Sequence, residues 1–267
     1  TIMSKKLSPI AGTTLVEILI GIVISMIMMA AMFTSYQAVN NSYSQVIDRA
    51  KISQTGRSII GMLIKDVRIA GFKYFDDVSK SPTDYVPILI TKSTGTGSCD
   101  KIDIMYSDRS VQPGSSPKAY DYTTYKITYE CKASNIVDKK TNQKINAFAI
   151  YKSKSKWSGS NWVAPANSTD DLIYKDEMIV DHVQDFILLP IDEKGKIINP
   201  IPTTLAASNK ITVVDIMLSV RSQNPFFKKT KSFISHSLGS KTNATFDDKF
   251  LREAIVVSAN TRNMGLE

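Results

Sequence analysis

The sequence is short of the residues that build catalytic and metal sites. It contains two histidines, His182 and His236, and two cysteines, Cys99 and Cys131. Neither histidine lies in a His-Glu-x-x-His spacing, and the chain has no Gly-x-Ser-x-Gly elbow and no phosphate-binding loop. We therefore predict that the chain is not an enzyme and carries no catalytic residue, metal site or cofactor.

Charge of one sign is not dominant either. Lys and Arg number 33 against 25 Asp and Glu, so the net charge is +8. Hydrophobic residues make up 43% of the chain, which is close to the average for folded proteins and excludes wholesale disorder. A local basic excess lies in residues 132–156, which hold seven lysines and one aspartate.

One long apolar run lies near the N-terminus. Residues 15–33 carry a single charge, Glu17, and as a helix they would span about 28 Å, close to the thickness of a bilayer core. Lys5 and Lys6 precede this run, and the first twelve residues contain no acid. The positive-inside rule then keeps the N-terminus in the cytoplasm and sends the rest of the chain across the membrane. We expect a membrane anchor over about residues 13–35.

Helical periodicity continues beyond the apolar run. Apolar residues recur at spacings of three and four as far as position 67, and Gly71 is a typical C-terminal stop. One helix over residues 13–70, about 87 Å long, is therefore predicted. Tyr36, Val39 and Tyr43 precede the rest of the fold, so we expect neighbouring helices to cover them. Asp66 and Arg68 are expected to be surface or helix-end charges that pack against the sheet, with an intersubunit contact as the alternative.

After Gly71 the pattern changes to short, often alternating runs rich in Tyr, Ile, Val and Thr, which is typical of strands. The fold class is therefore α+β, with the long helix packed on a mainly antiparallel sheet in a head of residues 71–267. Strands are expected at 86–91, 101–106, 122–131, 146–152, 183–189, 211–222 and 254–261, with turns at 94–98, 112–117, 157–168 and 199–202.

The two cysteines lie on the expected exported side of the membrane. In an oxidising compartment an isolated pair is more often a disulfide than two free thiols. We therefore expect a disulfide between Cys99 and Cys131.

The N-terminal motif resembles the class III signal of type IV prepilins and pseudopilins. It consists of Lys5-Lys6 and, further on, the run GTTLVE at 12–17. The resemblance implies that a prepilin peptidase cuts between Gly12 and Thr13, that residues 1–12 are the leader, and that Glu17 becomes the fifth mature residue. Thr13 stands where this family usually has Phe or Met, which leaves N-methylation open. A plain single-pass anchor is the alternative.

Glu17 is unusual because an unpaired carboxylate near the start of an apolar run is energetically expensive. The functional interpretation is an assembly carboxylate that pairs with the N-terminal amine, or a polar neighbour, of an adjoining subunit. Such a pair is strong at low dielectric and can set the axial register of packed helices.

Other segments resemble PilW-type minor pilins, namely Gly56-Arg57 with MLIKDVRIAGF at 62–72, VDHVQDF at 180–186, and FLRE at 250–253 with TRN at 261–263. The resemblance implies an inner-membrane protein of a Gram-negative bacterium with a periplasmic head, later incorporated into a surface fibre. Its partners would be other minor pilins, the major pilin, the inner-membrane assembly platform and the lipid bilayer. It would initiate or tip the fibre and so support adhesion and twitching motility, with DNA uptake as a further role of such fibres. A J-type minor pseudopilin of a type II secretion system, which has the same leader, is the alternative.

The basic excess admits two further interpretations. Cations that hold phosphates beside aromatic rings that stack bases would make an anionic-ligand patch, as in a membrane-anchored DNA-binding competence protein. A solvated sheet edge, protected from aggregation by lysines, is the simpler interpretation. The residues concerned are Lys152, Lys154 and Lys156, with Tyr151, Trp157 and Trp162 beside them.

Overall fold

The computed structural model describes residues 14–73, 82, 85–93, 99–111, 114, 120–137, 142–163, 173–234, 238–239 and 245–264. The chain forms two compact units, residues 1–48 and 49–267. The described part of the first unit is helical after Thr14, and the second unit contains the end of the helix together with all of the strands.

Helix α1 (Leu15–Ile69) confirms the predicted long N-terminal helix. Its first part is long and apolar enough to cross a membrane. The apolar side chains of this part are exposed in the isolated chain, with Leu15 79% and Val46 66% accessible. Tyr36, Val39 and Tyr43 are likewise exposed. The structure therefore contains a large apolar helical surface that no described residue of the chain covers.

The end of α1 packs on the sheet of the second unit. Ile52, Ile59, Leu63 and Val67 are spaced by seven, four and four residues, so they lie on one stripe of the helix, and all four belong to the main hydrophobic core. The helix ends at Gly71, whose φ of 76° is a left-handed conformation that favours glycine. The Gly71 amide donates to the carbonyl oxygen of Met105 at 2.9 Å, which ties the helix end to the sheet.

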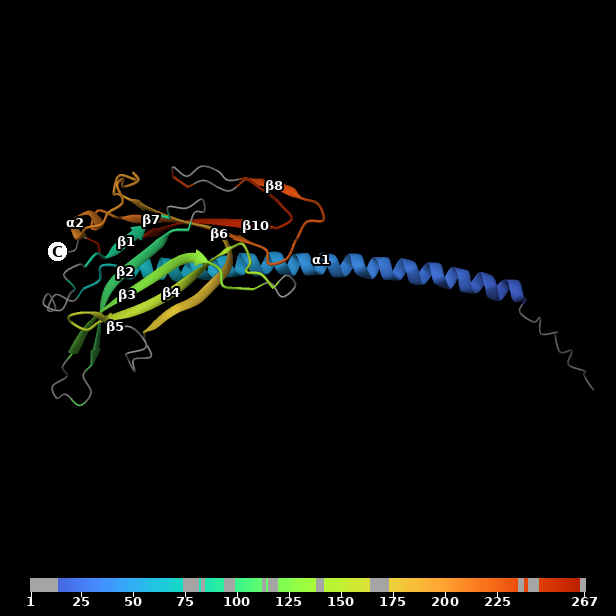
Figure 1. Ribbon diagram of the computed structural model, residues 1–267, viewed down its shortest axis with the longest axis horizontal. Coiled ribbons are helices and arrows are strands. Elements are labelled where there is room, and N and C mark those ends of the chain that lie inside the picture. The colour runs from blue at the N-terminus through green and yellow to red at the C-terminus, as the bar shows by residue number, and fades with distance from the viewer. Residues whose placement is uncertain are drawn as a thin grey trace, which may run out of the picture. The chain divides into compact units, whose positions relative to one another are not determined.

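The main sheet is antiparallel, with strand order β1-β2-β3-β4-β6-β7-β10, and β5 pairs with β4 (Figure 1). A separate two-stranded sheet pairs β8 with β9. The strands are β1 (Ile88–Thr91), β2 (Lys101–Val111), β3 (Tyr120–Ala133), β4 (Phe148–Trp157), β5 (Trp162–Val163), β6 (Tyr174–Ile191), β7 (Val213–Arg221), β8 (Lys231–Ile234), β9 (Thr245–Asp248) and β10 (Arg252–Asn260). A short helix, α2 (Leu205–Ser208), precedes β7.

The predicted α+β class with a type IV pilin-like architecture is confirmed, and each of the seven predicted strand segments coincides with or overlaps an observed strand. The boundaries differ most for β4 and β6, which are longer than predicted. The prediction of turn over 157–168 is wrong at its start, because that segment holds the end of β4 and all of β5. The sequence prediction also missed α2, β8 and β9, which are each four residues long.

Strand alternation gives the main sheet two different faces. In β3, Ile127 and Tyr129 point into the core beneath α1, whereas Lys126, Thr128 and Glu130 point to the opposite side and are half-buried. The two faces are named the helix face and the outer face below. The main core fills the helix face, while a small apolar cluster of Ile187, Leu189, Met217 and Leu238 lies apart from it.

Candidate functional site

The first turn of α1 holds Glu17 in a reciprocal cap. The Thr14 amide donates to Glu17 Oε2 at 2.9 Å, and the Thr14 hydroxyl donates to the same oxygen at 3.2 Å. In return the Glu17 amide donates to Thr14 Oγ1 at 3.4 Å. This capping box satisfies backbone donors that a helix N-terminus leaves free. It also gives the carboxylate a partner within its own chain, at the start of the apolar surface.

The predicted processing site, Gly12 and Thr13, lies outside the described residues. The structure therefore shows the carboxylate of Glu17 but not the segment that would carry the new amine. Thr14 was missed as a functional residue by the sequence prediction. A signal for it was present, since Thr-x-x-Glu before an apolar run is the capping-box pattern.

A buried polar cluster connects α1 to the sheet. Asp66 on α1 accepts a hydrogen bond from the Tyr129 hydroxyl at 2.5 Å, and Lys152 Nζ lies 2.8 Å from the same carboxylate oxygen. Asp66 is only 7% exposed, so the surface alternative of the prediction is wrong for this residue. The other alternative, a helix-end charge that packs against the sheet, is the one that the structure shows. Burial, reinforced by the negative charge of Asp66, raises the pKa of Tyr129 well above its usual range and keeps the phenol protonated as a donor.

The three predicted patch lysines lie on β4 at alternating positions, which places them on the helix face. Lys152 is held by Asp66 and has a side chain only 12% exposed. Lys154 Nζ lies 4.3 Å from the ring centroid of Tyr125, in a cation–π contact. Lys156 follows in the same alternation. β4 lies between β3 and β6 and is not a sheet edge, so the edge interpretation is wrong.

The aromatic residues of the same segment lie on the outer face. Trp157 and Trp162 are paired across β4 and β5, with ring centroids 5.2 Å apart. Lys126, which projects from the outer face of β3, lies 4.4 Å over the ring of Trp162. The pleat therefore separates the tryptophans from Lys152 and Lys154, and the combination that motivated a nucleic-acid interpretation does not form.

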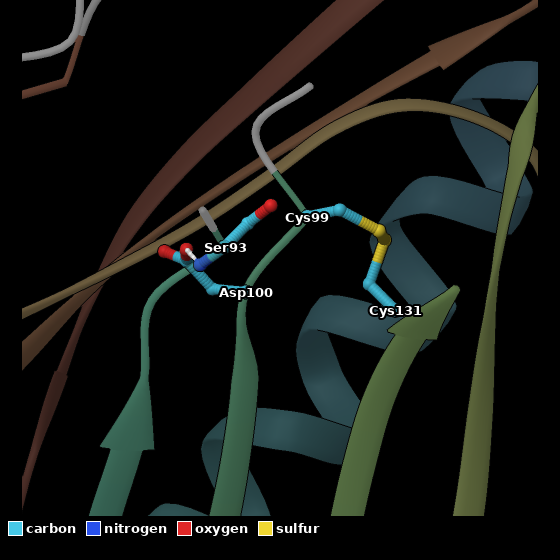
Figure 2. Close-up of a disulfide and its surroundings, with 4 residues drawn as sticks. All are labelled: Ser93, Cys99, Asp100 and Cys131. Atoms are coloured by element: carbon cyan, nitrogen blue, oxygen red, sulfur yellow. Dashed lines mark hydrogen bonds between the residues drawn. A yellow bond between two sulfur atoms is a disulfide. The ribbon is translucent and has the colours of Figure 1, made fainter. Parts of the chain in front are cut away.

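The two cysteines form a disulfide, as expected from the sequence. Cys99 and Cys131 have Cα atoms 5.1 Å apart and join the segment before β2 to the end of β3 (Figure 2). The neighbouring Asp100 is fully buried. Its carboxylate accepts hydrogen bonds from the amides of Ser93 at 3.1 Å and Leu188 at 2.9 Å, and forms an ion pair with Lys92. Asp100 was another residue that the sequence prediction missed.

The described residues contain no candidate metal site. Among them, no group of three or more His, Cys, Asp and Glu side chains could hold a metal ion. His182 is buried, and its Nδ1 lies 2.8 Å from the carboxylate of Asp181. This hydrogen bond lowers the pKa of Asp181 below its usual value. His236 lies outside the described residues.

Comparison with known proteins supports the architecture. No protein-family model and no curated protein matches the chain. Among solved structures, the chain is similar to a type IV-like pilin from Thermus thermophilus, with a TM-score of 0.50 and 11% identity over 79% of this chain and 96% of that chain. At that identity the likeness concerns the fold. The chain thus has a type IV pilin-like fold, with a long N-terminal helix followed by an antiparallel sheet.

Proposed function

We propose that this chain is a minor pilin of the PilW type, a membrane-anchored subunit that assembles with other pilins to initiate or tip a fibre. The observation that carries the proposal is the first part of α1, whose large apolar residues are exposed along the helix while one carboxylate, Glu17, lies at its start. A surface of this kind requires a covering in water. Lipid supplies it before assembly, and neighbouring helices supply it in a fibre.

The capping box gives Glu17 a defined state before assembly. In a bilayer an unpaired carboxylate is costly, and the Thr14 amide and hydroxyl reduce that cost by donating to it. Cleavage after Gly12 would create an amine at Thr13. On assembly the carboxylate of one subunit would exchange Thr14 for the amine of another, because opposite charges attract strongly in an apolar bundle.

The proposed function includes the division of the chain into leader, anchor and head that the sequence predicts. Residues 1–12 form a leader removed by a prepilin peptidase, residues 13–35 anchor the subunit in the inner membrane of a Gram-negative bacterium, and residues 71–267 form a periplasmic head. Other minor pilins, the major pilin and the inner-membrane platform are the partners. The disulfide supports this placement, since such bonds persist in oxidising compartments.

The test replaces Glu17 with Val in a strain whose single gene copy encodes the variant. Insertion and leader removal should persist, because the apolar run becomes longer and Gly12 is unchanged. Crosslinks to other pilins and the number of surface fibres should both fall by about tenfold or more, since the amine loses its buried partner. Thr14→Ala is the matched control: it removes the capping hydroxyl but keeps the carboxylate, so crosslinks should remain.

Mature protein should begin Thr-Thr-Leu-Val-Glu by N-terminal sequencing. Normal crosslinks and fibres in the Glu17→Val strain would falsify the assembly role, and loss of processing would move that role to peptidase recognition. Crosslinks to pseudopilins of a secretion system, with none to fibre pilins, would instead assign the chain to the J-type alternative.

A further inference from the structure

The outer face of the main sheet carries an open hollow built by β3, β4, β5 and β6. Its volume is about 330 Å³, and its lining includes Lys126, Thr128, Ser153, Ser155, Trp162 and Asp176. Lys126 is directly opposite Ser155 in the β3–β4 ladder, and Thr128 is opposite Ser153. Directly opposed residues point to the same side of a sheet. Four side chains with hydroxyl or ammonium donors therefore form the floor of the hollow.

The charges around the hollow are nearly balanced. Lys126 and Lys175 are matched by Glu130 and Asp176 among the lining residues. Lys132 Nζ lies 3.3 Å from the carboxylate of Glu130 and 3.1 Å from that of Asp176, so both acids are already paired. With Lys132 counted, three lysines stand against two carboxylates, and an excess of one cation is small for a polyanion, whose binding rests on several phosphate contacts. The hollow therefore suits a neutral ligand that offers both hydrogen-bond donors and acceptors.

One wall of the hollow is aromatic. Trp162 lines it and is half-buried, and Trp157 supports the indole edge-on at 5.2 Å between ring centroids. An indole has flat apolar faces, and the Lys126 ammonium lies 4.4 Å over the Trp162 ring, so a sugar that stacks on this face must displace that ammonium onto its own hydroxyls. The floor beside the ring offers further hydroxyl and carboxylate groups. A pyranose ring has a matching character, since one face is formed by C–H groups and the rim by hydroxyls.

A second hollow extends the first across the sheet. It has a volume of about 550 Å³ and shares Lys126 with the first, and its lining includes Tyr85, Asp103 and Met105. The Thr128 hydroxyl donates to the Asp103 carboxylate at 2.5 Å, which links the two hollows through side chains of the outer face. A ligand that occupies both must be longer than one sugar ring.

We propose that the outer face of the head binds a neutral oligosaccharide, with a sugar ring against Trp162 and its hydroxyls on Lys126, Ser153 and Ser155. This inference goes beyond the assembly function, because it uses the opposite face of the sheet from α1 and does not involve Glu17. Sugar binding can therefore be tested separately from fibre assembly, whether or not the assembly proposal holds.

The chain contains its own reporter. Trp157 and Trp162 are the two tryptophans of the sequence; Trp162 lines the hollow and Trp157 contacts the Trp162 ring. The full chain, in micelles of a detergent without a sugar headgroup, is titrated with maltohexaose, cellohexaose and chitohexaose while indole emission is recorded. A saturable change with at least one of them is expected. No saturable change with any of the three, up to about 20 mM, overturns the proposal.

Variants locate the binding. Trp162→Ala should weaken binding of the responding hexasaccharide about tenfold or more, measured by calorimetry, and Trp162→Phe should restore part of it. Lys126→Ala, a half-exposed position whose loss leaves the core intact, should also weaken binding. Lys154→Ala is the matched control, since it lies on the helix face of β4 and should leave sugar affinity unchanged. Thermal unfolding of each variant establishes that it is folded.

Two outcomes contradict the assignment. Unchanged affinity in folded Trp162→Ala and Lys126→Ala variants overturns it. An emission change with a twenty-base oligothymidine and with none of the sugars, weakened by added salt, would assign the hollow to nucleic acid instead.

Discussion

Asp66 shows how a single buried charge determines the contact between α1 and the sheet. Its carboxylate is shared by Tyr129 and Lys152, which come from β3 and β4. A buried ion pair is weak evidence of net stabilisation, because desolvation opposes the attraction between the charges. Removing one partner is a different case, since the remaining charge then lies buried and uncompensated. The cluster therefore favours one position of the helix on the sheet.

Lys152→Met tests this interpretation. The substitution keeps an apolar stem of similar length and removes the cation that lies 2.8 Å from the Asp66 carboxylate, while the Tyr129 hydroxyl still donates to it. We expect unfolding free energy to fall by about 3 kcal/mol, measured by urea denaturation in micelles and followed by tryptophan emission. The double variant Asp66→Leu/Lys152→Met should recover most of that loss.

Lys65→Met is the matched control on α1, because Lys65 is exposed beside Asp66. Its effect should stay within about 0.5 kcal/mol. A loss below about 1 kcal/mol in Lys152→Met would contradict the role of the pair.

At the scale of elements, α1 carries two glycines in different surroundings. A Cβ at Gly61 would meet no atom within 4 Å, whereas a Cβ at Gly56 would lie 2.6 Å from Cδ1 of Ile255 on β10. Gly56 is buried and permits the close approach of α1 to that strand. Gly61 only lowers the intrinsic stability of the helix, by about 1 kcal/mol relative to alanine.

Gly61→Ala should therefore raise the free energy of unfolding by about 0.5–1 kcal/mol. Gly56→Ala should gain less or destabilise, because Ile255 must move to make room. The double variant Gly56→Ala/Ile255→Val removes Cδ1 and should be more stable than the sum of its single variants predicts. Equal stabilisation by the two alanine substitutions, in urea denaturation, would refute the close contact.

At the scale of the whole molecule, the disulfide connects segments that the sequence keeps apart. Cys99 and Cys131 are 32 residues apart and are joined beside the buried carboxylate of Asp100, which binds backbone groups before β2 and on β6 (Figure 2). The covalent bond and the aspartate thus support the same end of the sheet.

Replacing both cysteines with Ala should lower the free energy of unfolding by about 3.7 kcal/mol, because the unfolded chain is no longer closed into a loop. The measurement is urea denaturation of the oxidised chain and of the double variant, with the reduced wild-type chain as control. The reduced chain should resemble the variant. Two free thiols in the intact mass of non-reduced periplasmic protein would show that the bond does not form in the cell.

Local patterns in the sequence determined the helix, most of the strands and the cysteine pair. The 3.6-residue period of α1 and its apolar run are properties of consecutive residues, so no tertiary information is needed to predict them. The alternation that marks β3 and β7 is equally local. Two cysteines leave only one intramolecular pairing, and a head that the sequence predicts to be exported favours its oxidation, which is why the disulfide was expected from the sequence.

The predicted ends of strands were less accurate where the local amino-acid composition does not favour a strand. β4 was predicted to end at Lys152, yet it continues to Trp157 through Lys154 and Lys156, although lysine is depleted in strands. That early end hid the alternation that separates Lys154 from Trp157. Pairing with β3 along the strand, a long-range interaction, stabilises the additional residues.

Only the tertiary structure decided which polar residues are buried and which face of the sheet is free. The sequence alone does not show that Asp66 is buried, because Tyr129 and Lys152 are far from it along the chain and become its neighbours only after folding. The outer hollow likewise joins residues of four strands that are adjacent only after folding. Helix period and strand alternation depend on local contacts, so the sequence alone determined them. Burial and cross-strand neighbours depend on long-range contacts, so only the tertiary structure decided them.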